Sequence, residues 1–455
     1  MMKNLRYLLL ALCLCASCGK TFLEKRSDKG LLVPSTLADF RALLDNLSVM
    51  NVAPTLPRIS ADLFYTNENG YNQYSTLERN CYIWAEDLYE GKGTGDWNYP
   101  YRQLFYANIV LDGLEKLGPD LKQSDDYREV KGAALFHRAL AVLHLSQIFV
   151  KPYVEENADT DLGLPIPLTA DVNERPDRGT LKQTYRQMIS DFDAAATLLP
   201  GQTLYKSRPS AMAVFAYLSR VYLIMGNYDK CDEYAEKVLS GHLQLLDYNE
   251  VDITASSPFP AALSNDNTEV IFHSVTSAYI FSQSGLTGFE QTFYDSFEEN
   301  DLRKALFFRL TSSNVIRPKN GYGSPLGTFA GIALDEIYLN RAECLARKGE
   351  LVKAAAYLDE LLSKRWQAGT YHPAIIDNRQ DLLRLILDER KKELLTHATM
   401  RWTDLRRLNL EEPFAVTITR TLEGKVYTLP PNDPRYTFPI PPNELEGNDL
   451  EQNTR

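Results

Sequence analysis

The chain of 455 residues contains 44% hydrophobic and 24% charged residues, which are ordinary globular values and exclude disordered and collagen-like classes. Its formal net charge of −11 argues against a role on nucleic acids or anionic membrane surfaces, because phosphate binding needs a basic face. Beyond the N-terminal segment, no apolar run reaches the roughly 18 residues of a membrane-spanning helix. We therefore expect a large globular protein with a sizeable core.

The first residues have the layout of a secretory signal. Lys3 and Arg6 precede an apolar run at residues 8–14, and small residues follow. The segment ends at Cys18, and it resembles a bacterial lipobox, although Cys15 stands where Leu is usual. We predict that residues 1–17 are removed as a lipoprotein signal peptide and that Cys18 is lipidated, with palmitate among the acyl chains. Such a protein is tethered to a membrane without spanning it. The alternative is an ordinary cleaved signal without a lipid.

A first loop-rich segment is predicted at about residues 52–96, after an entry helix near residues 37–47. It is dense in Tyr, Asn and Trp. Asn side chains bind hydroxyl groups, and Tyr and Trp rings stack on the apolar face of a sugar or a peptide side chain. We therefore predict ligand contacts at Trp84, Tyr71, Tyr74 and Asn72. The alternative is that these rings seal the loop onto the helices.

Four helix pairs are predicted, at about residues 97–150, 181–240, 335–366 and 379–407. In the second pair, apolar residues recur every three or four positions, a turn follows at Gly226, and a new apolar stripe begins at Cys231. Gly349 separates two such stripes in the third pair. This helix, glycine turn, helix pattern looks like tetratricopeptide repeats with irregular spacing. Since each hairpin buries only one side, we expect the pairs to stack on one another.

A second loop-rich segment is predicted at about residues 243–333. Residues 270–272 suit a short strand, and aromatic residues alternate with Gly and Ser around them. We predict that Tyr279 and Tyr322 contact the ligand. Farther along, Arg401, Asp404 and Arg407 are expected to form ion pairs that fix the C-terminal turns, and the chain from about residue 428 is Pro-rich and extended.

Patterns that carry covalent or metal chemistry are weak in this sequence. The glycine-rich residues 91–95 lack the rest of a phosphate-binding motif and are expected to form a turn. His137 and His144, two helical turns apart, have no third metal ligand in the sequence. Cys231 and Cys344 lie on apolar stripes, so burial is expected for both. We predict no catalytic residue, no metal site and no cofactor.

Short motifs follow one another along the chain in a characteristic order. Their residues are Gly132, Phe136, Arg138 and Ala139; residues 269–272; residues 389–394; residues 401–407; residues 439–444; and Gln452 with Asn453. Together they resemble the SusD/RagB family of nutrient-binding outer-membrane lipoproteins, and the resemblance covers nearly the whole chain. His397 and Ala398 depart from it, because Glu and Gly are usual at these two positions.

The resemblance implies a mostly α-helical fold, a SusD-like scaffold of four tetratricopeptide-like helix pairs with an irregular, loop-rich ligand-binding side. It implies one domain over residues 18–455, anchored to the outer membrane and exposed on the cell surface. Family members capture an oligosaccharide or a peptide and deliver it to a SusC-type TonB-dependent transporter. They perform no covalent chemistry, so the resemblance also implies that this protein is not an enzyme.

Two other classes of protein stay open from the sequence. The first is an extracytoplasmic glycoside hydrolase, because Asp247, Glu250 and Asp252 place carboxylates near aromatic residues. Hydrolysis needs two carboxylates at a defined separation, which spacing within one loop does not establish. The second is a helical-repeat scaffold that binds only other proteins.

Overall fold

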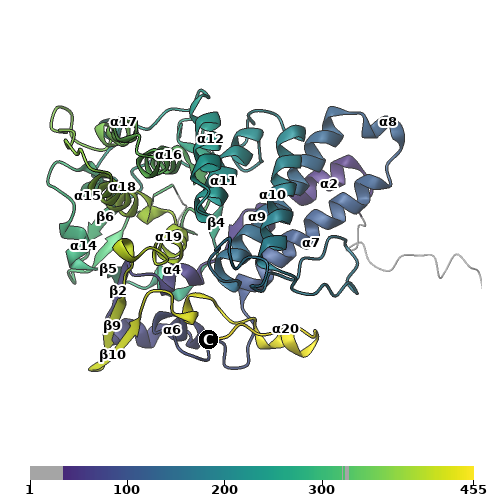
Figure 1. Cartoon of the computed structure of the whole chain (residues 1–455), viewed down its shortest axis with the longest axis horizontal. Helices are drawn as coiled ribbons and strands as arrows, with labels where there is room; N and C mark the ends of the chain where they lie inside the picture. The colour runs from purple at the N-terminus through teal and green to yellow at the C-terminus, as the bar shows by residue number, and fades with distance from the viewer. Residues whose placement is uncertain (1–33, 320, 323–326) are drawn as a thin grey trace, which may run out of the picture.

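The computed structural model describes residues 34–319, 321–322 and 327–455. Cys18 and the predicted signal peptide lie outside the described residues. About half of the described chain is helical and its strands are few and short, which confirms the predicted fold class. In Figure 1 the long helices form a row from α2 (Leu37–Leu44) to α17 (Leu351–Ser363), and short strands gather on one side below that row.

The first helix pair consists of two long helices. α7 (Gly95–Glu115) and α9 (Asp125–Phe149) are joined by the short α8 (Pro119–Lys122), and Ser124 caps α9 by accepting a hydrogen bond from the Tyr127 amide. α9 packs between α7 and α10 (Leu181–Leu198), so it is buried on most of its surface. This position explains why His137 and His144 are buried, where desolvation lowers their pKa values to about 4 and about 3.

The second pair continues the row in the predicted way. α11 (Ala211–Ile224) begins after Ser210, whose side chain accepts from the Ala213 amide. Gly226 has a φ of 70°, a left-handed conformation that glycine adopts without steric cost. The chain therefore reverses at Gly226 into α12 (Tyr228–Leu239). Buried Cys231 packs with Cys344 and Leu223 between neighbouring helices, as predicted for the two cysteines.

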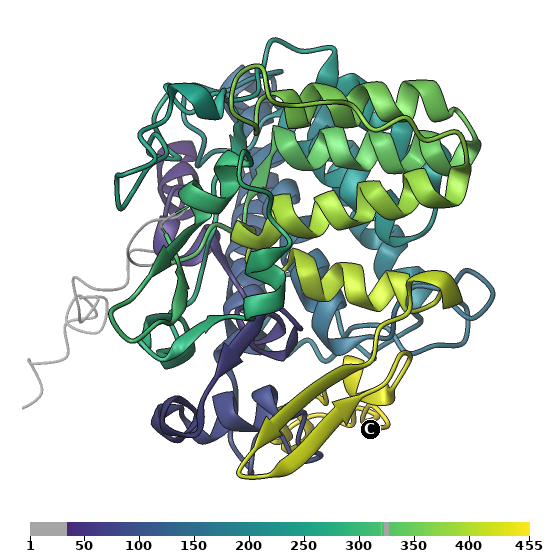
Figure 2. The same cartoon turned by 90° about the vertical axis from the view of Figure 1, so that its left-hand side faces the viewer.

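The last two pairs close the row. They contain α16 (Leu334–Lys348), α17, α18 (Arg379–Glu393) and α19 (Met400–Leu408). Gly349, with a φ of 85°, ends α16 in the left-handed conformation. α12 packs against α16, and α16 packs against both α17 and α18, so the repeats stack on one another. Figure 2 shows the light-green helices of these pairs above the yellow hairpin near the C-terminus.

Five two-stranded sheets lie in the described chain, and three of them connect segments far apart in sequence. Their strands are β1 (Val52–Ala53) with β4 (Val275–Thr276), β2 (Phe64–Thr66) with β5 (Thr287–Phe289), β3 (Val270–Phe272) with β8 (Ile332–Ala333), β6 (Phe308–Leu310) with β7 (Ile316–Pro318), and β9 (Ile418–Leu422) with β10 (Lys425–Leu429). The β1–β4 pair is parallel and the other four are antiparallel. The pairs β1–β4 and β2–β5 join the two loop-rich segments into one side of the molecule.

Short helices that the sequence did not indicate occur in the loop-rich segments and at a few places outside them. The additional short helices are α3 (Leu47–Met50), α4 (Leu56–Ser60), α5 (Glu68–Gln73), α6 (Thr76–Tyr82), α13 (Ile280–Gln283), α14 (Gln291–Asp295), α15 (Leu302–Phe307) and α20 (Pro442–Glu446), with 3-10 turns at Tyr248–Glu250, Leu394–Thr396, Glu412–Phe414 and Pro434–Tyr436. Most have one or two turns, which is too short for an apolar period to be visible in the sequence. Local caps define some of them: the Ser75 and Glu78 side chains form a capping box at α6.

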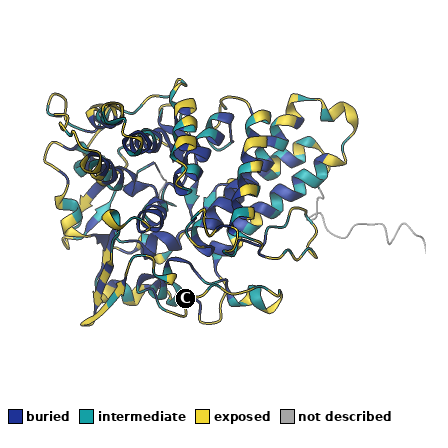
Figure 3. Cartoon of the chain, in the orientation of Figure 1, coloured by how far each residue is buried: buried dark blue, intermediate teal, exposed yellow. Residues whose placement is uncertain are grey.

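The main hydrophobic core runs between the helical row and the strands, and it includes residues from both loop-rich segments. Figure 3 shows buried residues on the inward faces of the helices and exposed residues along the outer edge of the β9–β10 hairpin. The expected ion pairs of α19 are confirmed: Arg401 pairs with Asp62 at 2.7 Å and Arg407 with Asp404 at 2.9 Å. Arg401 thereby ties α19 to the first loop-rich segment.

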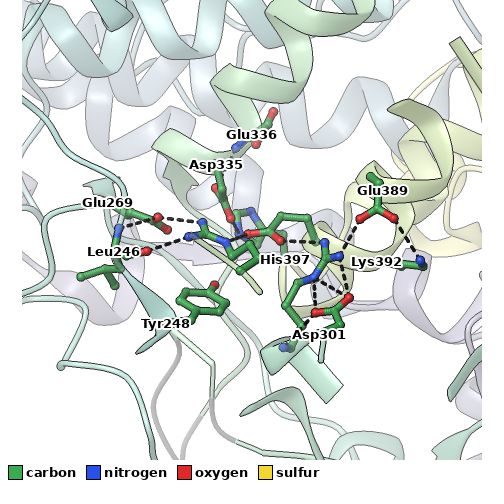
Figure 4. Close-up of polar contacts among 12 residues, drawn as sticks. Leu246, Tyr248, Glu269, Asp301, Asp335, Glu336, Glu389, Lys392 and His397 are labelled. Atoms are coloured by element: carbon green, nitrogen blue, oxygen red, sulfur yellow. Dashed lines mark hydrogen bonds and ion pairs between the residues drawn. The ribbon is translucent and has the colours of Figure 1, made fainter. Parts of the chain in front are cut away.

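A buried ion-pair network fixes the second loop-rich segment to the last helices (Figure 4). Arg365 donates to Glu269 and to Glu393, both at 2.7 Å. Glu393 also contacts Arg303 at 3.1 Å, and Arg303 donates to Glu389 at 2.6 Å. Three of these carboxylates belong to the motifs found in the sequence. Those motif residues therefore hold the scaffold together.

His397, which departs from the family pattern, also has a buried partner. Its Nε2 lies 3.0 Å from Oδ2 of Asp335 (Figure 4). Burial lowers the pKa of His397, but the charge of Asp335 and its hydrogen bond outweigh burial, and the net pKa is raised above the ordinary histidine value. His397 and Asp335 thus form a buried pair where the chain passes from α18 to α19.

Candidate ligand-binding site

The structure buries Trp84, the first residue predicted to contact ligand. Only 2% of its surface is exposed, and its Nε1 donates to the Ser60 carbonyl oxygen at 2.9 Å. The Arg420 guanidinium from β9 lies 4.5 Å from the Trp84 ring and 3.8 Å from the Tyr82 ring. These rings therefore clamp a strand of the C-terminal hairpin, which is the sealing role that the sequence left open as an alternative.

The neighbouring candidates divide between the core and the surface. Tyr74 is buried, and its hydroxyl lies 2.5 Å from Oγ1 of Thr287 on β5. Tyr71 is partly exposed beside the rings of Tyr74 and Tyr82, at centroid distances of 6.4 and 6.0 Å. Asn72 is exposed. Tyr71 and Asn72 are therefore accessible in this conformation, whereas Tyr74 is committed to joining the two loop-rich segments.

The two candidates of the second loop-rich segment are also held by internal hydrogen bonds. The hydroxyl of half-buried Tyr279 donates to Asp96 at 2.7 Å. Asp96 is fully buried and accepts from the amides of Thr55 and Leu56, so it fixes the start of α4. The hydroxyl of buried Tyr322 donates to Glu269 of the ion-pair network. None of the six predicted contact residues lines either of the two cavities described next.

A cavity of about 380 Å³ opens between the two loop-rich segments. We name it the basic cavity because four cationic side chains line it: Arg58, Arg309, Arg317 and Lys319. Its walls come from α4, from the chain around β4 and α13, from the β6–β7 hairpin and from the turn that precedes α19. Among the described residues, no Asp or Glu lines it. Its volume lies in the range of small-ligand sites.

Arg58 is the most deeply buried cation of the basic cavity. It is 6% exposed, its guanidinium lies 4.5 Å from the centroid of the Phe64 ring, and its Nη1 donates to Oγ1 of Thr328 at 2.5 Å. Its Nε has no hydrogen-bond partner among the described residues. Burial lowers the pKa of Arg58 to about 10, and no carboxylate of the described residues offsets this effect. Burying a charge without a counter-charge costs free energy of folding. A function of the basic cavity would explain why no described carboxylate lies beside Arg58.

The β6–β7 hairpin contributes two more cations on one face. Arg309 of β6 lies directly opposite Arg317 of β7 in the strand register. Burial, followed by the charge of Arg309, lowers the pKa of Arg317. The hairpin is held close to β5 at Gly288, where an added Cβ would lie 2.6 Å from the Ile316 carbonyl oxygen. The close backbone approach therefore fixes the position of the two arginines.

Neutral polar groups accompany the four cations. The Ser282 side chain is buried in the cavity wall and makes no hydrogen bond within the described chain. Thr276, Thr328 and Thr396 also line the cavity. Lys319 donates to the Ile253 carbonyl oxygen at 2.6 Å, and burial lowers its pKa although the nearby charge of Asp252 opposes this. The site thus combines uncompensated positive charge with hydroxyl groups.

A larger cavity, of about 660 Å³, lies beside α19 and the C-terminal segment. It is lined by charges of both signs and by many amide side chains. Lys151 pairs with Asp161 at 2.6 Å, and Asp433 pairs with Arg435 at 2.8 Å. Asn453 donates to the carbonyl oxygens of Phe149 and Phe438, which anchors the C-terminal segment. Most of its charge is therefore balanced within the protein, in contrast to the basic cavity.

The carboxylates considered for glycoside hydrolysis have local structural partners. Asp247 accepts from the Asn249 amide and pairs with Lys364 at 2.9 Å. Asp252 accepts from the amide and hydroxyl of Thr254. In the part of the chain that the structure describes, no three His, Cys, Asp or Glu side chains are grouped to hold a metal ion. None of the described helices has the length and apolar character that crossing a bilayer requires.

Fold and cavity together define a helical-repeat protein with a loop-built pocket. Two family models match the chain: "Starch-binding associating with outer membrane" over residues 21–223, and "SusD family" over residues 332–454. Between them they cover well over half of the sequence. The chain belongs to the SusD/RagB family, as the motifs indicated.

Relatives and solved structures agree with this assignment. The chain is 23% identical over 398 residues to "SusD-like protein P2" of Formosa agariphila, covering 73% of this chain and 74% of the relative. A SusD superfamily protein of Bacteroides thetaiotaomicron has a TM-score of 0.75 at 22% identity, covering 92% of this chain and all of its own. A surface glycan-binding protein A of Bacteroides fluxus has a TM-score of 0.68 at 17% identity, covering 92% and 99%. These structural similarities establish the fold.

The cations of the basic cavity were not among the residues predicted from the sequence. One signal was present: Arg309 and Arg317 flank a Thr-Ser-Ser-Asn turn at positions that share a face if the turn is a hairpin. Arg58 and Lys319 gave no such signal, because they reach the cavity only through the pairing of segments that lie more than 200 residues apart.

Proposed function

We propose that this protein is a cell-surface, glycan-binding lipoprotein that captures an oligosaccharide on its loop-rich side. Membership of the SusD/RagB family supports the class, and the model name "Starch-binding associating with outer membrane" points to carbohydrate at this location. The observation that carries the proposal is the basic cavity, a site of suitable volume built by both loop-rich segments. Tyr71 and Asn72 are accessible residues that we propose as further contacts.

We further propose that the captured glycan passes to a SusC-type TonB-dependent transporter and that Cys18 carries the lipid anchor. The stacked helices form a rigid row suited to docking against such a partner. We expect the glycan to be released chemically unchanged. Asp247 and Asp252, two of the carboxylates considered for hydrolysis, instead act as local caps of the backbone. A hydrolase requires two carboxylates facing one sugar-binding cleft, and none lines the basic cavity among the described residues.

The test is a glycan and peptide array on the purified protein, with the products of each bound compound analysed afterwards. We expect binding to at least one oligosaccharide and its recovery unchanged. Turnover of the bound glycan would identify a hydrolase instead. Binding of proteins alone, with no glycan or peptide retained, would favour the helical-repeat interaction scaffold. Co-purification with an outer-membrane transporter from the native membrane tests the delivery role.

A further inference from the structure

The charge of the basic cavity is opposite to that of the protein around it. The chain has a formal net charge of −11, yet four cations and no described carboxylate line this one cavity. A negatively charged protein repels an anionic ligand at long range. Recognition of such a ligand must therefore come from local groups that approach it closely, in a pocket where water screens charges less than at an open surface.

Two features make this arrangement unfavourable without a ligand. Within the part of the chain that the structure describes, the Nε of buried Arg58 has no acceptor, and its Nη1 donates only to a neutral hydroxyl, that of Thr328. Arg309 and Arg317 are like charges directly opposite each other in a hairpin, a pairing that destabilises a sheet. Elsewhere in the same protein, buried Arg220 and Arg365 have the carboxylate partners Glu336 and Glu269, whereas buried Arg406 and Arg420 donate to backbone carbonyl oxygens. Among the described residues, no carboxylate lines the basic cavity beside its cations, and an anionic ligand would neutralise them.

We propose that the basic cavity binds the oxyanion groups of an acidic oligosaccharide, either uronic acid carboxylates or sulfate esters, an inference that rests on the proposed function and narrows its ligand class. Planar guanidinium groups match a carboxylate or a sulfate with paired hydrogen bonds. Arg317 and Arg309 supply such groups at the entrance, and Arg58 supplies one at depth. The hydroxyl of Ser282, which makes no hydrogen bond to any described residue, would supply a further contact to a sugar hydroxyl.

An oligosaccharide explains the mixture of groups better than an acidic peptide. Thr276, Ser282 and Thr328 offer hydroxyls beside the cations, and these suit ring hydroxyls placed next to an acidic group on the same sugar. An extended peptide is commonly recognised by adding a strand to an exposed sheet edge. The basic cavity is instead enclosed by side chains from four different segments. Such a site suits a compact acidic sugar better than an extended peptide.

The test measures binding of the purified full-length protein by calorimetry to three oligosaccharides of equal length. One is a neutral glucan, one an oligogalacturonate and one a sulfated galactan fragment. We expect at least one acidic compound to bind about tenfold more tightly than the neutral one, since hydrogen bonds to charged groups contribute more than those between neutral groups. This preference should fall as salt rises. The acidic compound that binds distinguishes carboxylate from sulfate recognition.

The decisive variant is Arg309→Gln combined with Arg317→Gln, because Arg309 is exposed and the hairpin keeps its apolar contacts. It should lose about tenfold in affinity for the acidic compound and keep its affinity for the neutral one. Arg384→Gln, on the exposed face of α18, is the matched control and should change neither. Circular dichroism and the thermal midpoint of each variant confirm that it is folded.

Each other outcome overturns the inference in a distinguishable way. If neutral and acidic oligosaccharides bind equally well, the proposed function stands but the preference for an acidic ligand is wrong. If hexaglutamate binds tightly and no saccharide binds, the ligand is not a glycan and both proposals are wrong. If inorganic sulfate at the same concentration competes as well as the sulfated fragment, the cavity is a simple anion site. If no saccharide of any kind binds, here or on the array, the proposed function fails and the inference fails with it.

Discussion

Arg309 and Arg317 are directly opposite partners across the β6–β7 hairpin, and no described acidic side chain pairs with either of them. Their neighbours in register are apolar, Phe308 opposite Pro318 and Leu310 opposite Ile316. Since side chains alternate between the two faces of a hairpin, the two cations share one face and the apolar pairs share the other. The two cations thus repel each other at the cavity, while Phe308 and Ile316 are buried on the other face of the hairpin.

Relieving this repulsion should stabilise the protein. We expect Arg309→Thr to raise the free energy of unfolding by roughly 0.5 kcal/mol at low salt, because a like-charge cross-strand pair is removed and Thr favours strands. The gain should shrink as salt rises. Urea titration at two ionic strengths measures it, with Arg384→Thr on α18 as control for the loss of one surface charge. A variant less stable than the wild type at low salt would contradict this view of the pair.

Trp84 is expected to stabilise the fold more than it binds ligand. Trp84→Ala removes a fully packed ring and its hydrogen bond to Ser60, so the free energy of unfolding should fall by about 3–5 kcal/mol. Tyr65→Ala, at a residue 45% exposed on the neighbouring strand, should have little effect. Denaturant unfolding compares the two variants. If Trp84→Ala kept wild-type stability and instead abolished glycan binding, Trp84 would be a ligand contact as first predicted.

The buried network should respond strongly to the loss of its central cation. Arg365→Met leaves Glu269 and Glu393 buried without their shared partner, and breaking such a pair from one side costs about 3–5 kcal/mol. Lys353→Met, which breaks an exposed pair with Glu350, should leave the urea midpoint unchanged because exposed pairs contribute little. Similar midpoints for the two variants would show that the network carries no special stability.

Asp96 should give the protein a measurable pH dependence. Burial raises the pKa of Asp96 to about 6, against the opposing hydrogen bonds from Leu56, Tyr279 and Thr55. The carboxyl keeps its proton in the folded chain at pH values where the unfolded chain has lost it. Its contribution is therefore fully present below about pH 4 and is lost as pH rises through about 6.

Asp96→Asn keeps an acceptor for the two α4 amides but cannot titrate. The free energy of unfolding of the wild type, minus that of the variant, should fall by roughly 2–3 kcal/mol between pH 4 and pH 7. Taking the difference cancels the titration of other groups. Urea unfolding across this range provides the measurement, and a difference that stays flat would mean that the carboxyl is not held in its protonated form.

Lipidation at Cys18 remains a prediction from the sequence. Cys18→Ala should release the protein from the membrane fraction into the soluble fraction, because acyl chains supply the membrane affinity of a tethered protein. Cys13→Ala, five residues upstream, is the matched control and should stay membrane-bound. Cell fractionation with mass spectrometry of the mature N-terminus provides the measurement. Persistent membrane attachment of Cys18→Ala would rule out this anchor.

The sequence alone determined the helical scaffold. An apolar period of 3.6 residues and a glycine turn are local signals, so the pairs around Gly226 and Gly349 could be located without tertiary information. The motifs could also be recognised from the sequence, although their use was not visible there. Glu269 and Glu393 turned out to hold the scaffold, because their shared partner Arg365 lies in another segment.

The basic cavity is visible only in the tertiary structure. Aromatic density in residues 52–96 could serve either a ligand or the core, and only the position of Arg420 shows that Trp84 and Tyr82 pack inward. Arg58 and Arg317 meet because β1 pairs with β4 and the β6–β7 hairpin packs against β5. Such contacts depend on the register between distant strands, which no short sequence pattern encodes. The uncompensated charge of the cavity is therefore a property of the folded chain.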